Sequence, residues 1–174
     1  MGMLVFDTET TGIPFHPSSK PDVQPRVIEF GAVLLDDEWE VVEECELLIN
    51  PGAPLPAIIT KITGLTDDDL ADAPGFDEVY PKIEALFGRA DAVAAHNLPF
   101  DLTMLELDIT RLDLAPLDLG GKRLICTVQE HFEEFGKRMK LQQLYEHYTG
   151  GPLRQTHRAL DDVMALATVV RASL

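Results

Sequence analysis

The chain has little of what marks secreted proteins and proteins that coat polyanions. Its 174 residues include only two cysteines, and 14 lysines and arginines stand against 30 aspartates and glutamates. Cys45 and Cys126 lie in apolar runs typical of strands, so we expect buried free thiols rather than a disulfide or a metal pair. The net charge of −16 argues against binding along a broad nucleic-acid surface by phosphate neutralisation. It leaves open both an ordinary acidic surface and an enzyme that grips a few nucleotides through metal ions.

Long apolar runs are also absent. None approaches the roughly 20 residues that a helix needs to cross a bilayer. The first ten residues have no basic region and include Asp7, so we do not expect a signal peptide. The default expectation is a cytoplasmic protein without a membrane partner. Because no repeat or linker interrupts the chain, we expect a single domain, residues 1–174, large enough to bury a core.

Two kinds of hydrophobic pattern follow each other along the chain. Runs rich in β-branched residues at 4–9, 26–36 and 40–49 predict strands, the last two forming an antiparallel hairpin. Later, short apolar runs at 91–96 and 122–127 alternate with segments of helical spacing. The expected helices cover residues 76–88, 98–109, 128–135, 141–148 and 157–172. The order predicts an α/β fold: a mixed five-stranded sheet, an antiparallel meander followed by parallel strands, flanked by helices.

The strand at 4–9 carries two acids on one face. Because side chains alternate along a strand, Asp7 and Glu9 point to the same side, and Phe6 and Thr8 point to the other. Adjacent carboxylates repel each other, and ligation of a divalent metal is one use for such a pair. A lone Asp-x-Glu is common, however, and by itself is more typical of a solvated strand end.

Two further segments place acids at the start of a predicted helix. Asp101 falls in the first turn after strand 91–96, and His157 stands just before Asp161 and Asp162. A metal site assembled from distant segments has this pattern. Four carboxylates would carry about −4, which two divalent cations could balance while clamping a phosphodiester from both sides. A histidine there suits a general base, because imidazole accepts protons near neutral pH.

Five stretches, in order and at fitting spacing, resemble the DnaQ-like, DEDDh-type 3′–5′ exonucleases, the superfamily of proofreading subunits on the ribonuclease H-like fold. The resemblance covers nearly the whole chain. VFDTETTG (5–12) resembles the first motif, HNLPFD (96–101) the second, and HRALDD (157–162) the histidine-type third motif, H-x(4)-D. RVIEFGAVLLD (26–36) resembles the second strand of the family. In ITGLTDDDL (62–70), Thr63 stands where many members have histidine. The tyrosine-type third motif, Y-x(3)-D, finds no match.

This resemblance implies a 3′–5′ exonuclease domain that hydrolyses single-stranded DNA, or frayed 3′ ends, to nucleoside 5′-monophosphates in proofreading or repair. Two Mg²⁺ or Mn²⁺ ions would be held by the four acids Asp7, Glu9, Asp101 and Asp162. His157 would activate the attacking water. Contacts to the terminal nucleotide are implied for Thr10, Thr11 and Gly12, with Leu65 wedging against the terminal bases and Phe100 stacking there. For Leu65 and Phe100, a place in the core is an equally open interpretation.

Cations are few, so their positions carry information. Arg154 and Arg158 bracket His157, and Lys137, Arg138 and Lys140 lie between two predicted helices. We hypothesise that these groups receive the substrate backbone, with ordinary solvated surface as the alternative.

Other functions share these motifs. An exonuclease acting on RNA or short oligoribonucleotides would use the same acids, because discrimination depends on contacts near the 2′ position. A nuclease-like binding module without catalysis is disfavoured by the intact set of acids and histidine. The expected partner is the 3′ end of a single-stranded nucleic acid, DNA before RNA, and a DNA polymerase is a further partner that the resemblance allows.

The third motif contains two adjacent aspartates, and only one can serve His157. In an unbroken helix, Asp161 would share the face of His157, and Asp162 would lie about 140° away. The apolar residues of 160–170 nevertheless place Asp162 nearer the buried face, and the H-x(4)-D resemblance also selects it. Both facts agree if His157 precedes the helix, which would begin at about Arg158 or Ala159. We therefore expect a loop histidine, more mobile than the four acids, that works with Asp162.

Overall fold

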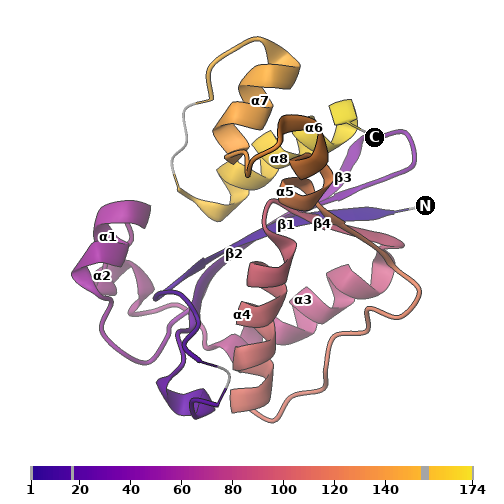
Figure 1. The fold of residues 1–174 in the computed structure, drawn as a ribbon. Coiled ribbons are helices and arrows are strands. Elements are labelled where there is room, and N and C mark those ends of the chain that lie inside the picture. The colour runs from indigo at the N-terminus through magenta and orange to yellow at the C-terminus, as the bar shows by residue number, and fades with distance from the viewer. Residues whose placement is uncertain (1, 17, 154–156, 174) are drawn as a thin grey trace.

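The computed structural model describes residues 2–16, 18–153 and 157–173, and its five strands form one mixed sheet in the order β3-β2-β1-β4-β5 (Figure 1). The strands are β1 (Met3–Thr10), β2 (Val27–Leu35), β3 (Val41–Leu48), β4 (Ala92–Ala95) and β5 (Arg123–Cys126). The first three strands pair antiparallel. Strand β4 pairs in parallel with β1, and β5 pairs in parallel with β4. The expected fold class, with its hairpin and its change of direction, is confirmed.

Helices cover both faces of the sheet (Figure 1). On one face, α3 (Phe76–Arg89) and α4 (Leu98–Arg111) pack against Leu4 and Phe6 of β1. On the other, α7 (Leu141–Thr149) and α8 (Ala159–Ser173) pack against Val5. The alternation of β1 thus decides where its polar end points: Asp7 and Glu9, in phase with Val5, emerge on the α8 face. Both cysteines are buried free thiols, as expected.

The short helices differ from the sequence-based expectation. Helices α1 (Ala57–Thr63) and α2 (Asp67–Leu70) and the 3₁₀ turn η1 (Pro21–Val23) were not predicted, because one or two turns are too short to show a 3.6-residue period. Residues 128–135 form two helices instead of one: α5 (Thr127–Glu130) and α6 (Phe132–Phe135), separated at His131. The ring of His131 binds the Thr127 carbonyl and the Tyr148 hydroxyl, so this break is built into the packing.

Among the residues that the structure describes, no helix has both the length and the apolar character needed to cross a bilayer.

Candidate active site

The end of β1 brings two acids and a close helix contact together. In the antiparallel register with β2, Asp7 faces Gly31 and Glu9 faces Glu29. A Cβ atom added at Gly31 would lie 2.4 Å from the Ala159 carbonyl carbon. Only glycine lets the start of α8 approach the sheet this closely, so α8 begins beside Asp7 and Glu9.

Asp101 reaches the same end of β1 from the other face of the sheet. It lies in the first turn of α4 and is 3% exposed. One carboxylate oxygen accepts hydrogen bonds from the Thr8 backbone N–H at 3.1 Å and from the Thr8 hydroxyl at 2.8 Å. Thr8 therefore fixes the carboxyl of Asp101 against the strand that carries Asp7 and Glu9.

His157 precedes α8 and does not belong to it. Helix α8 begins at Ala159, as expected, and its first bond joins the Asp162 N–H to the Arg158 carbonyl at 3.1 Å. His157 has a φ of 53°, in the left-handed region. Asp162 is buried with 7% exposure, whereas Asp161 is exposed. The chain thus turns at His157 and presents Asp162 to the sheet.

This turn brings two segments to one point, the end of β1 and the start of α8. One ligand atom each from Glu9, His157 and Asp162 lies within 4.8 Å of the others. The His157 ring therefore lies close to Asp162, and the expectation that the two work together stays a prediction. Whether His157 is more mobile than the acids stays a prediction.

Burial raises the pKa values of three of these acids, and repulsion between the acids adds to the effect for Asp7 and Glu9. Burial, and then the negative charges of Asp101 and Glu9, raise the pKa of Asp7 well above its ordinary value. Burial and the charge of Asp162 raise the pKa of Glu9 from 4.5 to about 8. Burial raises the pKa of Asp101 to about 7 against the lowering effect of the Thr8 hydrogen bonds. Clusters of acids with raised pKa values are typical of functional sites, where bound cations or transferred protons offset the negative charge.

Divalent cations fit this donor set. Carboxylate oxygens are the ligands that Mg²⁺ and Mn²⁺ prefer, and imidazole is an acceptable neighbour. Bound cations would also lower the pKa of Glu9, which burial and the neighbouring negative charges raise. We therefore treat Asp7, Glu9, Asp101 and Asp162 as candidate metal ligands, with His157 beside them.

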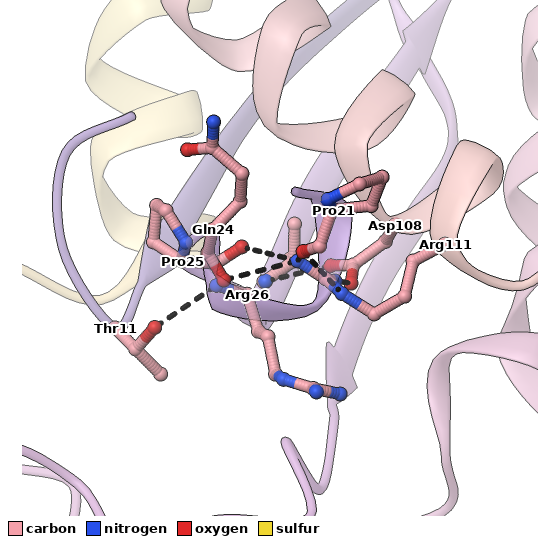
Figure 2. Close-up of polar contacts among 8 residues, drawn as sticks. Thr11, Pro21, Gln24, Pro25, Arg26, Asp108 and Arg111 are labelled. Atoms are coloured by element: carbon pink, nitrogen blue, oxygen red, sulfur yellow. Dashed lines mark hydrogen bonds and ion pairs between the residues drawn. The ribbon is translucent and has the colours of Figure 1, made fainter. Parts of the chain in front are cut away.

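Residues distant in the sequence hold the turn that follows Asp7 and Glu9 (Figure 2). The Thr11 N–H donates to the Arg26 carbonyl at 2.8 Å, and the Arg26 N–H donates to the Thr11 hydroxyl at 2.9 Å. The guanidinium of Arg111, from the end of α4, donates to the carbonyls of the segment before Arg26: Pro21, Gln24 and Pro25. Arg111 also pairs with Asp108, whose other oxygen accepts from the Val27 N–H at 2.9 Å. The backbone of the turn is thereby tied to α4.

A hollow of about 460 Å³ lies along this turn. Thr11 and Gly12 form part of its wall, together with the exposed side chains of Ile13 and Phe15. A larger hollow of about 520 Å³ lies between α4 and residues 113–119, and none of the candidate site residues lines it. Of these two, only the hollow at Thr11 adjoins the strand that carries Asp7 and Glu9.

Comparison with known proteins agrees with this geometry. A family model described as an exonuclease, RNase T, matches residues 4–170. The chain belongs to this exonuclease family. It is 31% identical over 166 residues to the PolC-type DNA polymerase III of Caldanaerobacter subterraneus, and 31% identical over 170 residues to that of Clostridium perfringens. The two matches span 95% and 98% of this chain, but only 11% of the length of each relative.

Solved structures share the fold at low identity. A 3′-exonuclease described as recognising the 3′ end of a histone mRNA stem-loop superposes with a TM-score of 0.77 at 18% identity, covering 97% of this chain and 79% of that one. E. coli exonuclease I in complex with a dA16 oligonucleotide gives a TM-score of 0.77 at 19% identity, covering 98% of this chain and 40% of that one. These likenesses establish the exonuclease fold.

The residues expected to contact substrate differ in how accessible they are in this exonuclease domain. Thr10, Thr11 and Gly12 do form the turn after the acids, where the Thr10 hydroxyl donates to the Gly12 carbonyl at 2.7 Å. Leu65 is 4% exposed and packs with Ile28 and Leu70, so a wedge role would require it to be uncovered. Phe100 is half-buried against the main core. Both roles stay predictions, and the core interpretation explains the observed packing.

Of Arg154 and Arg158, which bracket His157, only Arg158 lies among the described residues. Arg154 lies outside the described residues. The Arg158 guanidinium is held by Glu29 and Glu46, so its expected contact with substrate competes with a structural use.

Of the other basic cluster, Arg138 donates to the Asn97 side-chain oxygen at 3.3 Å, which brings that segment to the start of α4. Asn97 is the N-cap residue of α4 but makes no side-chain capping bond. The neighbouring His96 binds the Thr127 hydroxyl at 2.9 Å, and burial lowers its pKa to about 4, which fits a structural histidine.

Sequence reasoning missed three residues that hold the site together. Glu29 is a fully buried acid inside an otherwise apolar strand, and that exception was visible in RVIEFG. Asp108 and Arg111 stand three residues apart at the end of α4, a spacing at which helical side chains meet. Their further partners lie on a distant segment, so no local pattern indicates what they contact.

Proposed function

We propose that this domain removes nucleotides from the 3′ end of single-stranded DNA, or of frayed duplex ends, and releases nucleoside 5′-monophosphates with the help of two divalent cations, Mg²⁺ or Mn²⁺. The observation that carries the proposal is the meeting of Glu9, His157 and Asp162 within 4.8 Å at the end of β1. Membership of the exonuclease family supports the same chemistry. Similarity to PolC-type polymerases supports a proofreading context with a DNA polymerase as partner.

The four acids would hold the cations and, through them, the scissile phosphate. Two cations bound there would stabilise the charge on the attacking and leaving oxygens of the phosphodiester. Asp101 is pre-oriented for this work by Thr8, and Asp162 by the first turn of α8. Fixed ligands reduce the reorganisation that the reaction requires, which is how a prearranged polar site lowers a barrier.

His157 would take the proton from the attacking water. Its side chain is exposed and stands at the open side of the acid cluster, where a water molecule can reach it. A base placed within hydrogen-bonding reach of the water contributes about 10²- to 10⁴-fold to the rate. Thr11 and Gly12 would present backbone and hydroxyl groups to the terminal nucleotide, whose base the adjoining hollow could admit.

The test uses one single-stranded oligonucleotide labelled at its 5′ end, so that trimming from the 3′ end gives a descending ladder. We expect a ladder with Mg²⁺ or Mn²⁺, none with excess chelator, and none for Asp7→Asn. Products that start as short labelled fragments would indicate the opposite polarity and contradict the proposal.

The same assay decides the substrate class. Single-stranded DNA, a duplex with a mismatched 3′ end and a short RNA are compared by kcat/KM at one salt concentration. We expect both DNA substrates to exceed the RNA. A preference for RNA would replace DNA trimming by RNA degradation, and absence of cleavage on all three would leave the binding module as the better account.

A further inference from the structure

Arg158 and Glu29 form a buried ion pair under the start of α8. The Arg158 Nε donates to the two Glu29 carboxylate oxygens at 2.9 and 3.2 Å, and its Nη2 lies 2.8 Å from one of them. The Glu29 side chain is completely buried, while that of Arg158 is 35% exposed. The second Glu29 oxygen also accepts from the Ala159 N–H at 3.3 Å. One carboxylate of β2 thus holds two consecutive residues at the beginning of α8.

Each member of this pair has a candidate site residue as its neighbour. Glu29 faces Glu9 across the β1–β2 register, and Arg158 directly follows His157. Gly31, two residues along the same face of β2, allows the close contact with Ala159. The segment that contributes His157 and Asp162 is therefore fixed to the strand beside the one that carries Asp7 and Glu9.

Arg158 also pairs with a fifth acid beside the site. Glu29 lies near enough to Glu9 for its charge to raise the pKa of Glu9, but its own carboxylate is occupied by Arg158 and Ala159. Without the guanidinium, an unpaired buried carboxylate would stand beside the candidate metal ligands, which is costly for a folded protein.

We propose that Glu29 and Arg158 are positioning residues of the exonuclease site: their ion pair sets the place of His157 and Asp162 relative to Glu9. This inference rests on the proposed function, and it assigns Arg158 to the enzyme's own architecture instead of to the nucleic-acid backbone. The two assignments differ in measurable ways, because a phosphate contact acts on substrate binding and its salt dependence, whereas misplacement of His157 and Asp162 acts on turnover.

The main variant is Arg158→Lys, which keeps the charge but cannot form the forked contact. We expect kcat on single-stranded DNA to fall by about 10- to 100-fold, since small misplacements of catalytic groups have effects of this size, with KM changed by less than about threefold. The matched control is Glu46→Gln, which removes the exposed partner of Arg158 and should change kcat by less than about twofold. A raised KM with unchanged kcat and a shallower salt dependence would overturn the proposal, as would full activity of Arg158→Lys.

A second variant guards against misfolding. The double change Glu29→Gln and Arg158→Gln removes both charges together, so no unpaired buried charge remains. We expect it to fold, as shown by a cooperative thermal transition, and to share the kcat defect. A folded double variant with wild-type kcat would overturn the proposal.

A readout independent of turnover separates this inference from the proposed function. The imidazole resonances of His157, assigned by comparison with His157→Ala, should shift in Arg158→Lys and stay unchanged in Glu46→Gln. If the wild-type domain cleaves no nucleic acid, the proposed function fails, and this spectrum alone judges the positioning role. An unchanged His157 signal in Arg158→Lys would overturn it.

Discussion

At the scale of the residue, the backbone of His157 is the most informative single feature. A φ of 53° is uncommon for a residue with a side chain, and such conformations persist where the surrounding structure requires them. The other two non-glycine residues with positive φ among those described, Trp39 and Asp113, have a simpler explanation, since they lie at the β2–β3 turn and just after α4. His157 instead stands between the end of a loop and a helix that carries Asp162. Its conformation aims the ring at the acids.

Replacing His157 by Ala tests the base role at this scale. We expect kcat to fall by about 10²- to 10⁴-fold while the domain stays folded, because the exposed ring supports no core contact. The control is His147→Ala, a change of an exposed histidine on α7, which should leave kcat within about twofold of the wild type. Single-turnover kinetics measure the chemical step directly. Near-normal turnover in His157→Ala would assign proton transfer to another group.

At the scale of the element, α4 serves the site from both of its ends. Asp101 stands in its first turn, and Asp108 and Arg111 in its last turns tie down the segment that leads into β2 (Figure 2). Through the paired bonds between Thr11 and Arg26, that segment holds the turn after the acids. The helix therefore relates the acid site to the turn proposed to hold the terminal nucleotide.

Arg111→Met measures the strength of this tie. The side chains of Arg111 and Asp108 are both 4% exposed, so the change leaves a buried carboxylate without its cation. We expect the free energy of unfolding in urea to fall by about 3 kcal/mol or more. Arg89→Met is the matched control, since it breaks the exposed pair with Glu43 and should cost less than about 1 kcal/mol. Equal losses in the two variants would contradict the structural importance of the Arg111 tie.

The same scale shows what the sequence could and could not predict. The strand alternation of residues 4–9 was enough to place Asp7 and Glu9 on one face, because alternation is a local pattern. The apolar face of residues 160–170 favoured Asp162 modestly, and the H-x(4)-D resemblance selected it as well. The Glu29–Arg158 pair joins residues 129 positions apart, and Arg111 reaches the Gln24 carbonyl 87 positions away. Such partners are decided by packing of whole elements, so no local period reveals them. Short helices such as α2 were not predicted for the opposite reason, since a single turn is too short to show a period.

At the scale of the whole molecule, the charge of −16 and the raised pKa values of the site acids make stability depend on pH and on cations. Glu9 titrates near 4.5 in an ordinary setting and at about 8 in the fold. The folded state therefore holds a proton that the unfolded state releases between these values. In that window stability falls as pH rises, and Asp101, with a pKa of about 7, adds to the fall.

Thermal unfolding without divalent ions should therefore show a Tm that decreases from about pH 5 to about pH 8. Mg²⁺ bound at the proposed site would stabilise only the folded state, so the gain in Tm should be larger at the higher pH, where the acids are ionised. Glu9→Gln should flatten the decrease, because the amide does not titrate. A Tm that rises over this window in the metal-free wild type, or an equal Mg²⁺ effect at both pH values, would contradict the electrostatic account.

The central claim is that Asp162, and not its neighbour, joins Glu9 and His157 in one metal-dependent site. Asp162 is buried and Asp161 is exposed. Replacement of either residue by asparagine removes one negative charge, so the two variants make the same chemical change at neighbouring positions. Trimming of a 5′-labelled single strand with Mn²⁺ by the two variants is the most direct test. The account predicts a loss of more than about 100-fold in kcat for Asp162→Asn and activity within about threefold of the wild type for Asp161→Asn. Loss of activity in Asp161→Asn with retention in Asp162→Asn would contradict it.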